Sequence, residues 1–320
     1  MSLKDRVLVT GGAGFIGSQL VRDLVDKKYK VIVMDNLIAG RRENLKEIPC
    51  ILEVKDIRNQ KHCEKILKEY KINYVLHLAA EPFIPKGYQD PEIMFNTNTL
   101  GTLRLLLSCS KYPVERFIYY SSSEIYGTAI STPMDEHHSL HPHSIYAVSK
   151  LAGEKCAVVL EKEKQIPVVV LRQFNTFGPR EAQPYIIPEI ISQFTRTGHL
   201  KLGNIQAKRD FTYVKDSSSA AISVMESKSY LNGEIFNVGS GKAISILDVV
   251  KIISPLMNRP YFAITVDSTR LRPYDVNLLE CNASKIEKMV GWKPTYSFEQ
   301  GMKETIEWFK KSGNKWSWEK

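Results

Sequence analysis

The sequence predicts an α/β fold, with a Rossmann-type doubly wound parallel sheet followed by a smaller C-terminal lobe. Three observations support this prediction. In the first half of the chain, short runs rich in β-branched residues alternate with amphipathic stretches. A glycine-rich segment separates the first such run from the first helical stretch. Beyond about Asn175 the alternation gives way to proline-rich turns, so we expect the architecture to change there.

The elements of this sheet can be placed in order along the chain. Apolar runs predict strands over residues 7–9, 31–34, 74–78, 116–120 and 168–171, and a further segment ends near Asp56. Because the runs are continuously apolar, both faces of the strands should be buried, as in a parallel sheet. Helices are expected over residues 18–27 and later near residues 188–197 and 297–311.

Composition and charge narrow the class of protein. The 320 residues are 43% hydrophobic and 25% charged, which is ordinary for a globular enzyme or binding protein. The net charge of +9 comes from dispersed lysines without a nucleic-acid-binding motif, so we expect a phosphorylated small-molecule ligand and no nucleic acid partner. No apolar run reaches membrane-spanning length, which predicts a cytoplasmic protein without a membrane partner. Five scattered cysteines predict reduced, structural thiols and no metal site.

The glycine-rich segment has the spacing of a dinucleotide-binding loop. Gly11, Gly14 and Gly17 follow the first strand, with Phe15 and Ile16 between the last two. These glycines allow a tight turn and close approach of a pyrophosphate to the helix N-terminus. Asp35 and Asn36 end the next strand about 20 residues on, where a carboxylate can bond both ribose hydroxyls and would repel a 2′-phosphate. This favours NAD, although Arg41 and Arg42 leave NADP open.

A second group of residues suggests hydride chemistry on an alcohol. Tyr146 and Lys150 are four residues apart, so on a helix they share one face, where an ammonium group can lower the pKa of a phenol and make it a base. Upstream, Ser122, Ser123 and Glu124 follow the strand predicted over residues 116–120. A carboxylate near the same site suggests a second proton abstraction. Each residue also has an ordinary alternative, as a core tyrosine, a surface lysine, a turn serine or a solvated carboxylate.

In order along the chain, these motifs resemble the extended short-chain dehydrogenase/reductase family that acts on nucleotide sugars. The resemblance rests on Gly11, Gly14 and Gly17, on His77-Leu78-Ala79-Ala80, on Asn98 to Thr102, on Tyr146 with Lys150, on Arg209-Asp210-Phe211 and on Arg272-Pro273. It implies that NAD stays bound and is recycled while the sugar is oxidised at C4. It also implies that Tyr146 is the base, Lys150 its pKa modulator and a ribose ligand, and Ser122 a hydrogen-bonding partner of the same substrate oxygen.

The resemblance also implies how the chain is divided and how it assembles. Residues 1–174 are expected to form the NAD-binding Rossmann domain, and residues 175–320 mostly a nucleotide-sugar-binding lobe, with the chain crossing back to the first domain at least once. Leu78, Ala79, Ala80 and Asn98 are expected to contact NAD. Asp56 and Ile57 are expected at the adenine, with a helix cap as the alternative role for Asp56. Helices near residues 99–110 and 146–161 resemble the four-helix dimer interface of the family, which predicts a homodimer.

Glu124 distinguishes subfamilies within this resemblance. Epimerases generally carry a small or uncharged residue there, whereas 4,6-dehydratases carry Glu. After oxidation at C4 the C5 proton is acidic, so a carboxylate can remove it while water leaves from C6. Ser123 departs from the glucose-nucleotide dehydratases, which carry Asp, and resembles UDP-N-acetylglucosamine or GDP-sugar 4,6-dehydratases of nonulosonic-acid pathways. The expected product is a 4-keto-6-deoxy sugar or, if hydride returns to C4, a 5,6-ene.

Other activities remain alternatives at this point. UDP-glucuronate decarboxylases share Ser-Glu at this position but typically carry a further Arg after the Gly-Pro-Arg turn. Here Arg180 belongs to that turn, no further Arg follows before the helix, and Glu181 should repel a sugar carboxylate. A 4-epimerase, and a non-catalytic NAD-binding scaffold or sensor, are the remaining alternatives.

The substrate-binding residues are expected mainly in the C-terminal lobe. Asn175 resembles the residue that bonds the diphosphate or the hexose, Arg209 and Arg272 are candidates for the two phosphates, and Asp275 is a candidate for the ribose. Pro82 and Phe83 should line an apolar hexose pocket that suits an acetamido methyl group. The remaining expected contacts come from the turn and the lobe, at Arg180, Ile187, Leu202 and Asn204.

Overall fold

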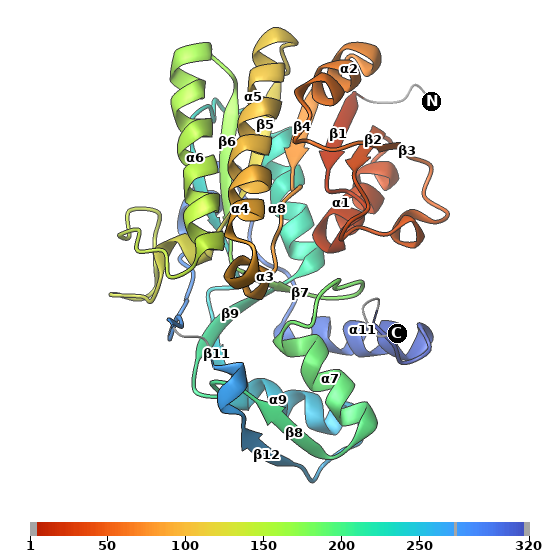
Figure 1. The fold of residues 1–320 in the computed structure, drawn as a ribbon, viewed down its shortest axis with the longest axis vertical. Coiled ribbons are helices and arrows are strands. Elements are labelled where there is room, and N and C mark those ends of the chain that lie inside the picture. The colour runs from red at the N-terminus through yellow and green to blue at the C-terminus, as the bar shows by residue number, and fades with distance from the viewer. Residues whose placement is uncertain (1–4, 272–273, 317–320) are drawn as a thin grey trace.

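The computed structural model describes residues 5–271 and 274–316, and it shows a sheet domain joined to a smaller lobe (Figure 1). The sheet domain has seven parallel strands in the order β10-β6-β5-β4-β1-β2-β3. Their bounds are Arg6–Thr10 (β1), Lys30–Asp35 (β2), Ile51–Val54 (β3), Tyr74–His77 (β4), Arg116–Ser122 (β5), Val168–Gln173 (β6) and Ile235–Val238 (β10). The strand order reverses between β1 and β4, which creates the crevice where doubly wound sheets bind ligands. The predicted fold class is confirmed.

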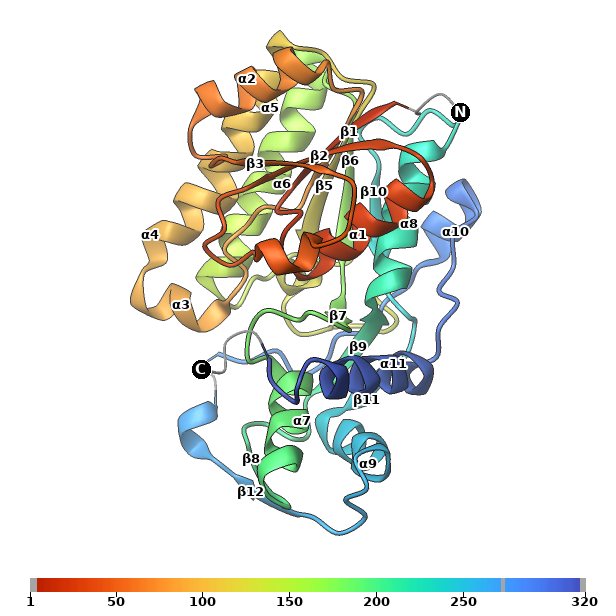
Figure 2. The same ribbon diagram turned by 90° about the vertical axis from the view of Figure 1, so that its right-hand side faces the viewer.

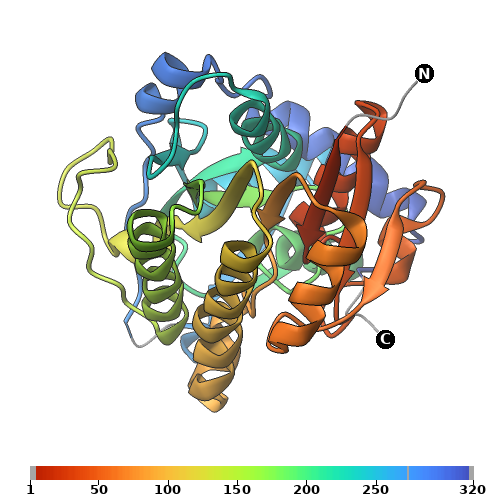
Figure 3. The same ribbon diagram turned by 90° about the horizontal axis from the view of Figure 1, so that it is seen from above.

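Helices cover both faces of the sheet. Figures 2 and 3 show α1, α8 and α10 on one side and α2, α5 and α6 on the other. Their bounds are Phe15–Asp26 (α1), Val214–Glu226 (α8), Ser284–Val290 (α10), Gln60–Tyr70 (α2), Thr102–Lys111 (α5) and Ile145–Lys164 (α6). Each face has its own buried apolar cluster, and the central strands supply alternate residues to the two clusters. This explains why the strand runs are apolar throughout.

Several helix boundaries differ from the sequence expectation. Helix α1 begins at Phe15, three residues earlier than expected, because Gly14 in extended conformation is its N-cap and the helix leaves the glycine loop directly. The helix expected over residues 99–110 starts as a π-helical segment, η2 (Phe95–Gly101), before α5. Two short helices, α3 (Ile84–Gln89) and α4 (Pro91–Met94), precede it. Helix α6 is capped by the Ser144 side chain, which accepts a hydrogen bond from the backbone N–H of Ala147.

Among the described residues, the lobe is built from two small sheets and three helices around a separate apolar core. One sheet has the order β11-β9-β7 and the other pairs β12 with β8. The strands are Ala243–Ser245 (β11), Lys208–Tyr213 (β9), Asn175–Phe177 (β7), Ala263–Val266 (β12) and His199–Leu202 (β8), and the helices are Ile186–Arg196 (α7), Ile246–Leu256 (α9) and Phe298–Lys311 (α11). Between these segments the chain returns to the first domain, since α8, β10 and α10 pack in or on the large sheet.

In the described part of the chain, three 3₁₀ segments complete the fold: η1 (Arg42–Leu45), η3 (Ser123–Tyr126) and η4 (Ser268–Arg270). All five cysteines are free. Within residues 5–271 and 274–316, no helix is long and apolar enough to span a membrane.

Candidate active site

A cavity of about 850 Å³ lies between the carboxyl ends of the sheet strands and the lobe. Both parts of the chain contribute to its wall. The wall includes most of the residues expected from the sequence to bind the cofactor, carry the chemistry or hold the substrate: Gly11, Gly14, Phe15, Ile16, Gly17, Asp35, Asn36, Ile57, Leu78, Ala79, Ala80, Pro82, Phe83, Ser122, Ser123, Glu124, Tyr146, Lys150, Asn175, Ile187, Leu202, Asn204, Arg209 and Asp275.

The glycine loop is packed too tightly for side chains at two of its positions. Gly11 has a φ of +71°, and a Cβ there would lie 2.8 Å from the backbone nitrogen of Ala79. A Cβ on Gly17 would lie 2.2 Å from the carbonyl oxygen of Gly11. The loop therefore keeps a bare backbone surface in front of the N-terminus of α1, where a pyrophosphate fits.

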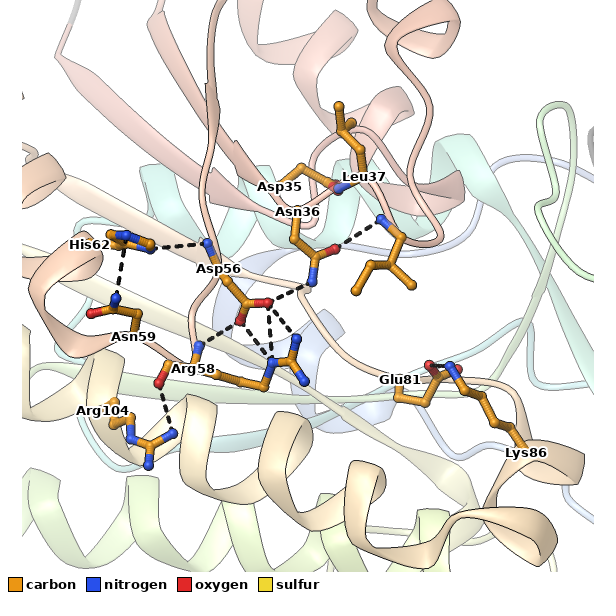
Figure 4. Close-up of polar contacts among 11 residues, drawn as sticks. Asp35, Asn36, Leu37, Asp56, Arg58, Asn59, His62, Glu81, Lys86 and Arg104 are labelled. Carbon is orange, nitrogen blue, oxygen red and sulfur yellow. Dashed lines mark hydrogen bonds and ion pairs between the residues drawn. The ribbon is translucent and has the colours of Figure 1, made fainter.

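Asp35 lies at the end of β2, on the cavity wall. Its carboxylate accepts hydrogen bonds from the backbone N–H groups of Ala13 (3.0 Å) and Leu37 (2.8 Å), and Figure 4 shows it turned toward Leu37. A Cβ on Gly40 would approach this carboxylate to 2.6 Å. Burial raises the pKa of Asp35, and the two backbone hydrogen bonds oppose that change. Each oxygen keeps a second lone pair, so the carboxylate can still accept from ribose hydroxyls.

Asp56 does not reach the cavity wall. Its carboxylate forms an ion pair with Arg58 (2.7 Å) and accepts a hydrogen bond from the Asn36 side chain (2.9 Å), as Figure 4 shows. Although burial acts to raise it, the hydrogen bonds from Arg58 and Asn36 lower the pKa of Asp56 to about 2. Asn59, and not Asp56, is the N-cap of α2. Of the pair expected at the adenine, the structure brings only Ile57 to the wall.

Asn98 and Arg180 also point away from the cavity. The Asn98 amide bonds the backbone of Glu81 and donates to Ser149 Oγ (3.0 Å), so it fastens η2 to α6. Arg180 has a φ of +69° and donates to Ser18 Oγ (3.1 Å) and Gln19 Oε1 (2.6 Å) on α1. Both side chains connect structural elements around the cavity and do not themselves line it. Arg272, a predicted phosphate ligand, lies outside the described residues.

The candidate catalytic side chains converge on one side of the cavity. Tyr146 and Lys150 come from the first turns of α6, Ser122 from the end of β5, and Glu124 from η3. Burial raises the pKa of Tyr146 to about 12; a hydrogen bond with Ser122 opposes this change, and the charge of Glu124 adds to it. Ser122 and Glu124 therefore both act on the Tyr146 phenol. Glu124 is only 8% exposed, which does not fit a solvated strand-end carboxylate.

Lys150 is buried one helical turn after Tyr146 on α6. Its ammonium group donates to the backbone oxygen of Tyr120 and lies 4.4 Å from the centre of the Tyr119 ring. Burial lowers the pKa of Lys150 to about 7, and the nearby Glu154 carboxylate opposes that change. The proton on Lys150 is therefore sensitive to its surroundings near neutral pH.

The lobe supplies polar groups at the other end of the cavity. Arg209 on β9 lies 3.4 Å from the carboxylate of Asp275, and Asn204 lies 3.5 Å from the same carboxylate. Asn175 Oδ1 is buried and has no hydrogen-bond partner among the described residues. A guanidinium beside a carboxylate and amides matches the groups that bind phosphates and ribose.

Sequence reasoning missed several wall residues. Tyr185 donates a hydrogen bond to the Pro82 carbonyl (3.3 Å) and packs edge-on against Phe83, which fixes the apolar part of the wall. Arg270 and Glu189 form an ion pair of 2.9 Å, and both line the cavity. No sequence motif identified Tyr185, Arg270 or Glu189 as site residues. The Pro-Tyr and Ser-Thr-Arg segments that contain the first two do lie near residues predicted to contact the substrate.

Glu181 corrects one argument made from the sequence. It lies on the cavity wall but is only 2% exposed, and its Oε2 atom has no partner in residues 5–271 and 274–316. Burial raises the pKa of Glu181 well above its ordinary value, which favours the neutral acid. A neutral carboxyl group would not repel a sugar carboxylate, so Glu181 gives no reason to reject decarboxylation.

Comparison with known proteins identifies the family of this chain. The family profile described as GDP-mannose 4,6 dehydratase matches residues 8–305. A putative UDP-glucose 4-epimerase of Methanocaldococcus jannaschii is 31% identical, over 95% of this chain and 98% of its own length. A UDP-N-acetyl-alpha-D-glucosaminuronate decarboxylase of Bacillus cytotoxicus is also 31% identical, over 98% of this chain and all of its own.

A solved structure of a related enzyme also matches this chain over nearly its whole length. The dTDP-glucose 4,6-dehydratase DesIV of Streptomyces venezuelae, solved with NAD bound, superposes with a TM-score of 0.88 at 27% identity, covering 98% of this chain and 99% of its own. The glycine loop and Asp35 fit NAD at the cofactor end of the cavity, and NAD is the cofactor of the family. The chain belongs to the NAD-dependent nucleotide-sugar epimerase/dehydratase family of short-chain dehydrogenases/reductases.

Proposed function

We propose that the enzyme is a nucleotide-sugar 4,6-dehydratase acting on UDP-N-acetylglucosamine. The observation that carries the proposal is the position of Glu124. This carboxylate is buried, lines the same cavity as Tyr146 and raises the pKa of the Tyr146 phenol through its charge. Oxidation at C4 needs only Tyr146, Lys150 and Ser122. A second base beside them suits a reaction with a second proton abstraction.

Each residue has one role in the proposed sequence. Tyr146, held by Ser122, takes the proton of the C4 hydroxyl, and charged Lys150 stabilises the phenolate. NAD, held by the glycine loop and Asp35, would supply the hydride chemistry at C4 and in the final step. Glu124 removes the C5 proton, which is acidic beside the C4 ketone, and can pass a proton to the C6 hydroxyl as it leaves as water. Hydride return to C6 with protonation at C5 gives a 4-keto-6-deoxy sugar, whereas return to C4 gives the 5,6-ene.

The substrate is inferred from the far end of the cavity. Arg209, Asn175 and Asp275 supply a cation, an amide and a carboxylate suited to a nucleoside diphosphate. Pro82 and Phe83, fixed by Tyr185, offer an apolar surface for an acetamido methyl group.

A 4-epimerase is the second candidate. Relatives named as 4-epimerases match this chain as well as the dehydratases do, and Tyr146, Lys150 and Ser122 are sufficient for that reaction. Decarboxylation is the third, weakened only by the absence of a further Arg between Arg180 and Pro188. A non-catalytic NAD-binding role would leave the buried Glu124 unexplained.

The experiment is to incubate the enzyme separately with UDP-N-acetylglucosamine, GDP-mannose, UDP-glucose and UDP-glucuronate and to weigh the products by mass spectrometry. The proposal expects loss of one water from UDP-N-acetylglucosamine. An unchanged mass with a new sugar configuration would establish the epimerase, and loss of carbon dioxide the decarboxylase. No turnover of any sugar by NAD-loaded protein would favour the scaffold.

A cytoplasmic homodimer is also part of the proposal. Half-exposed apolar side chains follow the outer surface of η2 and α6, the helices expected at the dimer interface: Phe95, Leu100, Ile145, Val148 and Val159. Sedimentation of the purified protein at twice the chain mass would support the dimer, and a monomer at micromolar concentration would contradict it.

A further inference from the structure

A buried ion pair lies directly behind the candidate catalytic residues. Glu154 follows Lys150 by four residues on α6, as Lys150 follows Tyr146, so the three side chains share one face of the helix. The Glu154 carboxylate is fully buried and receives two hydrogen bonds from Arg172 on β6, Nη2 to Oε1 at 2.7 Å and Nε to Oε2 at 3.2 Å. The Arg172 side chain is 3% exposed.

This pair connects the elements that carry the reacting groups. Ser121, next to Ser122 at the end of β5, donates to Glu154 Oε2 at 2.6 Å. Arg172 Nη1 donates to the hydroxyl of Tyr126, the last residue of η3, at 2.8 Å. Tyr126 in turn donates to Asn237 on β10 at 2.7 Å. The strand end before Ser122, the segment with Glu124 and the helix with Tyr146 are thus fastened to one another through two charges.

Stability alone does not explain these two charges. Replacing a buried ion pair with packed apolar side chains is often neutral or stabilising, whereas removing one partner is costly. The charges do affect their neighbour. Burial works against the ammonium form of Lys150, and the Glu154 carboxylate favours it. Arg172 neutralises Glu154 on its other side, so the pair acts on Lys150 at short range without leaving a net charge in the core.

We propose that Glu154 and Arg172 are positioning residues: Glu154 keeps Lys150 cationic, Arg172 offsets the charge of Glu154, and together they hold Ser122, Glu124 and Tyr146 in one arrangement. The proposal rests on the C4 oxidation by Tyr146, a step that the dehydratase, epimerase and decarboxylase reactions share. Neither residue lines the cavity, so their effect reaches the sugar only through Lys150 and the backbone of β5 and η3.

Other charged and titratable groups also face Lys150. His77 from β4 and Tyr119 from β5 lie near Lys150, and Glu124 from η3 acts on Tyr146, which precedes Lys150 by one turn on α6. Charged side chains on the other elements packed against α6 have partners of their own or face solvent. Glu92 is exposed, and the hydrogen-bonded ones are Lys86 with Glu81, Arg104 with the Arg58 carbonyl and Lys111 with Glu64. None of these groups changes in the variants below.

The proposal predicts shifts of opposite sign in two variants. Activity requires loss of a proton from Tyr146 and retention of one on Lys150, which gives a bell-shaped pH profile. Glu154→Gln removes a negative charge, so both protons are lost more readily and the whole bell moves to lower pH. Arg172→Met removes a positive charge, so the bell moves to higher pH. The shift in Glu154→Gln should be roughly one to two pH units, as for charges about one helical turn apart at an effective dielectric constant of about 20, and the shift in Arg172→Met should be smaller because that charge lies further from Lys150.

The test is the pH profile of kcat/KM for the full-length, NAD-loaded enzyme with whichever nucleotide sugar it converts. Glu161→Gln is the matched control, since Glu161 is also a buried, ion-paired carboxylate on α6 but lies further along the helix. Its profile should keep the wild-type optimum. Circular dichroism and bound NAD content check that each variant is folded.

The outcomes separate this inference from the proposed function. Lower rates in both variants with an unmoved optimum, or shifts of the same sign, would overturn the inference and leave the function standing. If either single variant fails to fold, the double variant Glu154→Gln/Arg172→Met decides. The double variant removes the negative charge of Glu154, which is nearer to Lys150, and the positive charge of Arg172, which is further from it. Its optimum should therefore move to lower pH, by less than one unit. An unchanged optimum there would also overturn the inference. No turnover by the wild type would refute the proposed function instead.

Discussion

The two ends of the cavity are built in different ways. At the cofactor end, backbone geometry shapes the wall: a Cβ at Gly11 or Gly17 would collide with neighbouring backbone atoms, and Asp35 is held by backbone N–H groups. At the sugar end, side chains from separate elements shape the wall, among them Glu124, Arg209 and Asp275. The first end can be kept across many substrates while the second changes. This fits the epimerases, dehydratases and decarboxylases that match this chain over nearly its whole length.

The largest effect is expected at the sugar end from Glu124→Gln. The amide cannot accept the C5 proton, so elimination should fall by roughly 10²–10⁴-fold, the usual contribution of a general base. NAD content should be unchanged, because Glu124 is not needed at the cofactor end. Turnover is followed by mass spectrometry and NAD by release after denaturation. Wild-type turnover in this variant would show that Glu124 is not the base.

The next effect is expected at the cofactor end. Gly17→Ala places a Cβ 2.2 Å from the Gly11 carbonyl, so the loop must move and NAD affinity should fall by roughly 5–150-fold, the equivalent of about 1–3 kcal/mol of overpacking. Gly198→Ala is the control, because Gly198 lies outside the cavity wall and its Cβ would have one contact, of 3.7 Å, with the Tyr261 carbonyl oxygen. Equal NAD affinities for the two variants, measured by titration calorimetry, would contradict the steric account.

A smaller effect should separate two arginines. Arg209→Ala is expected to raise the KM for the nucleotide sugar by roughly 10–100-fold, from the loss of a charge-assisted contact worth about 1.5–3 kcal/mol, with little change in kcat. Arg180→Ala should instead lower the melting temperature and leave that KM near the wild-type value, because Arg180 contacts α1. If Arg180→Ala raised the KM as much as Arg209→Ala, the claim that Arg180 does not contact the nucleotide sugar would be wrong.

The smallest effect concerns Asp56 and acid stability. Because its pKa is lowered in the folded protein, its contribution is present above the unfolded value near 4 and is lost as pH falls through about 2. Asp56→Asn should therefore lower the free energy of unfolding by about 1 kcal/mol at neutral pH and by almost nothing at pH 2, without weakening NAD binding. Urea unfolding at the two pH values measures this. A loss of NAD affinity in this variant would show that Asp56 contacts the adenine of NAD.

The sequence predicted most of the sheet because strands buried on both faces are apolar throughout. β10 was not predicted, because its residues follow the lobe and give no local sign of returning to the edge of the sheet. Motifs also located the glycine loop and the Tyr146 region, where the chemistry requires fixed spacing. These motifs could not predict where a side chain points when it binds another residue of the folded protein instead of lining the cavity. Asp56 turns to Arg58, Asn98 to Ser149 and Arg180 to Ser18, and each leaves the wall for that reason.

The central claim is that Glu124 removes the C5 proton. The direct measurement is conversion of UDP-N-acetylglucosamine in heavy water, with nuclear magnetic resonance used to locate deuterium in the product. We expect a dehydrated 4-keto-6-deoxy sugar with solvent deuterium at C5 from the wild type, and no dehydrated product from Glu124→Gln. An epimerised sugar of unchanged mass without deuterium at C5 would contradict the claim.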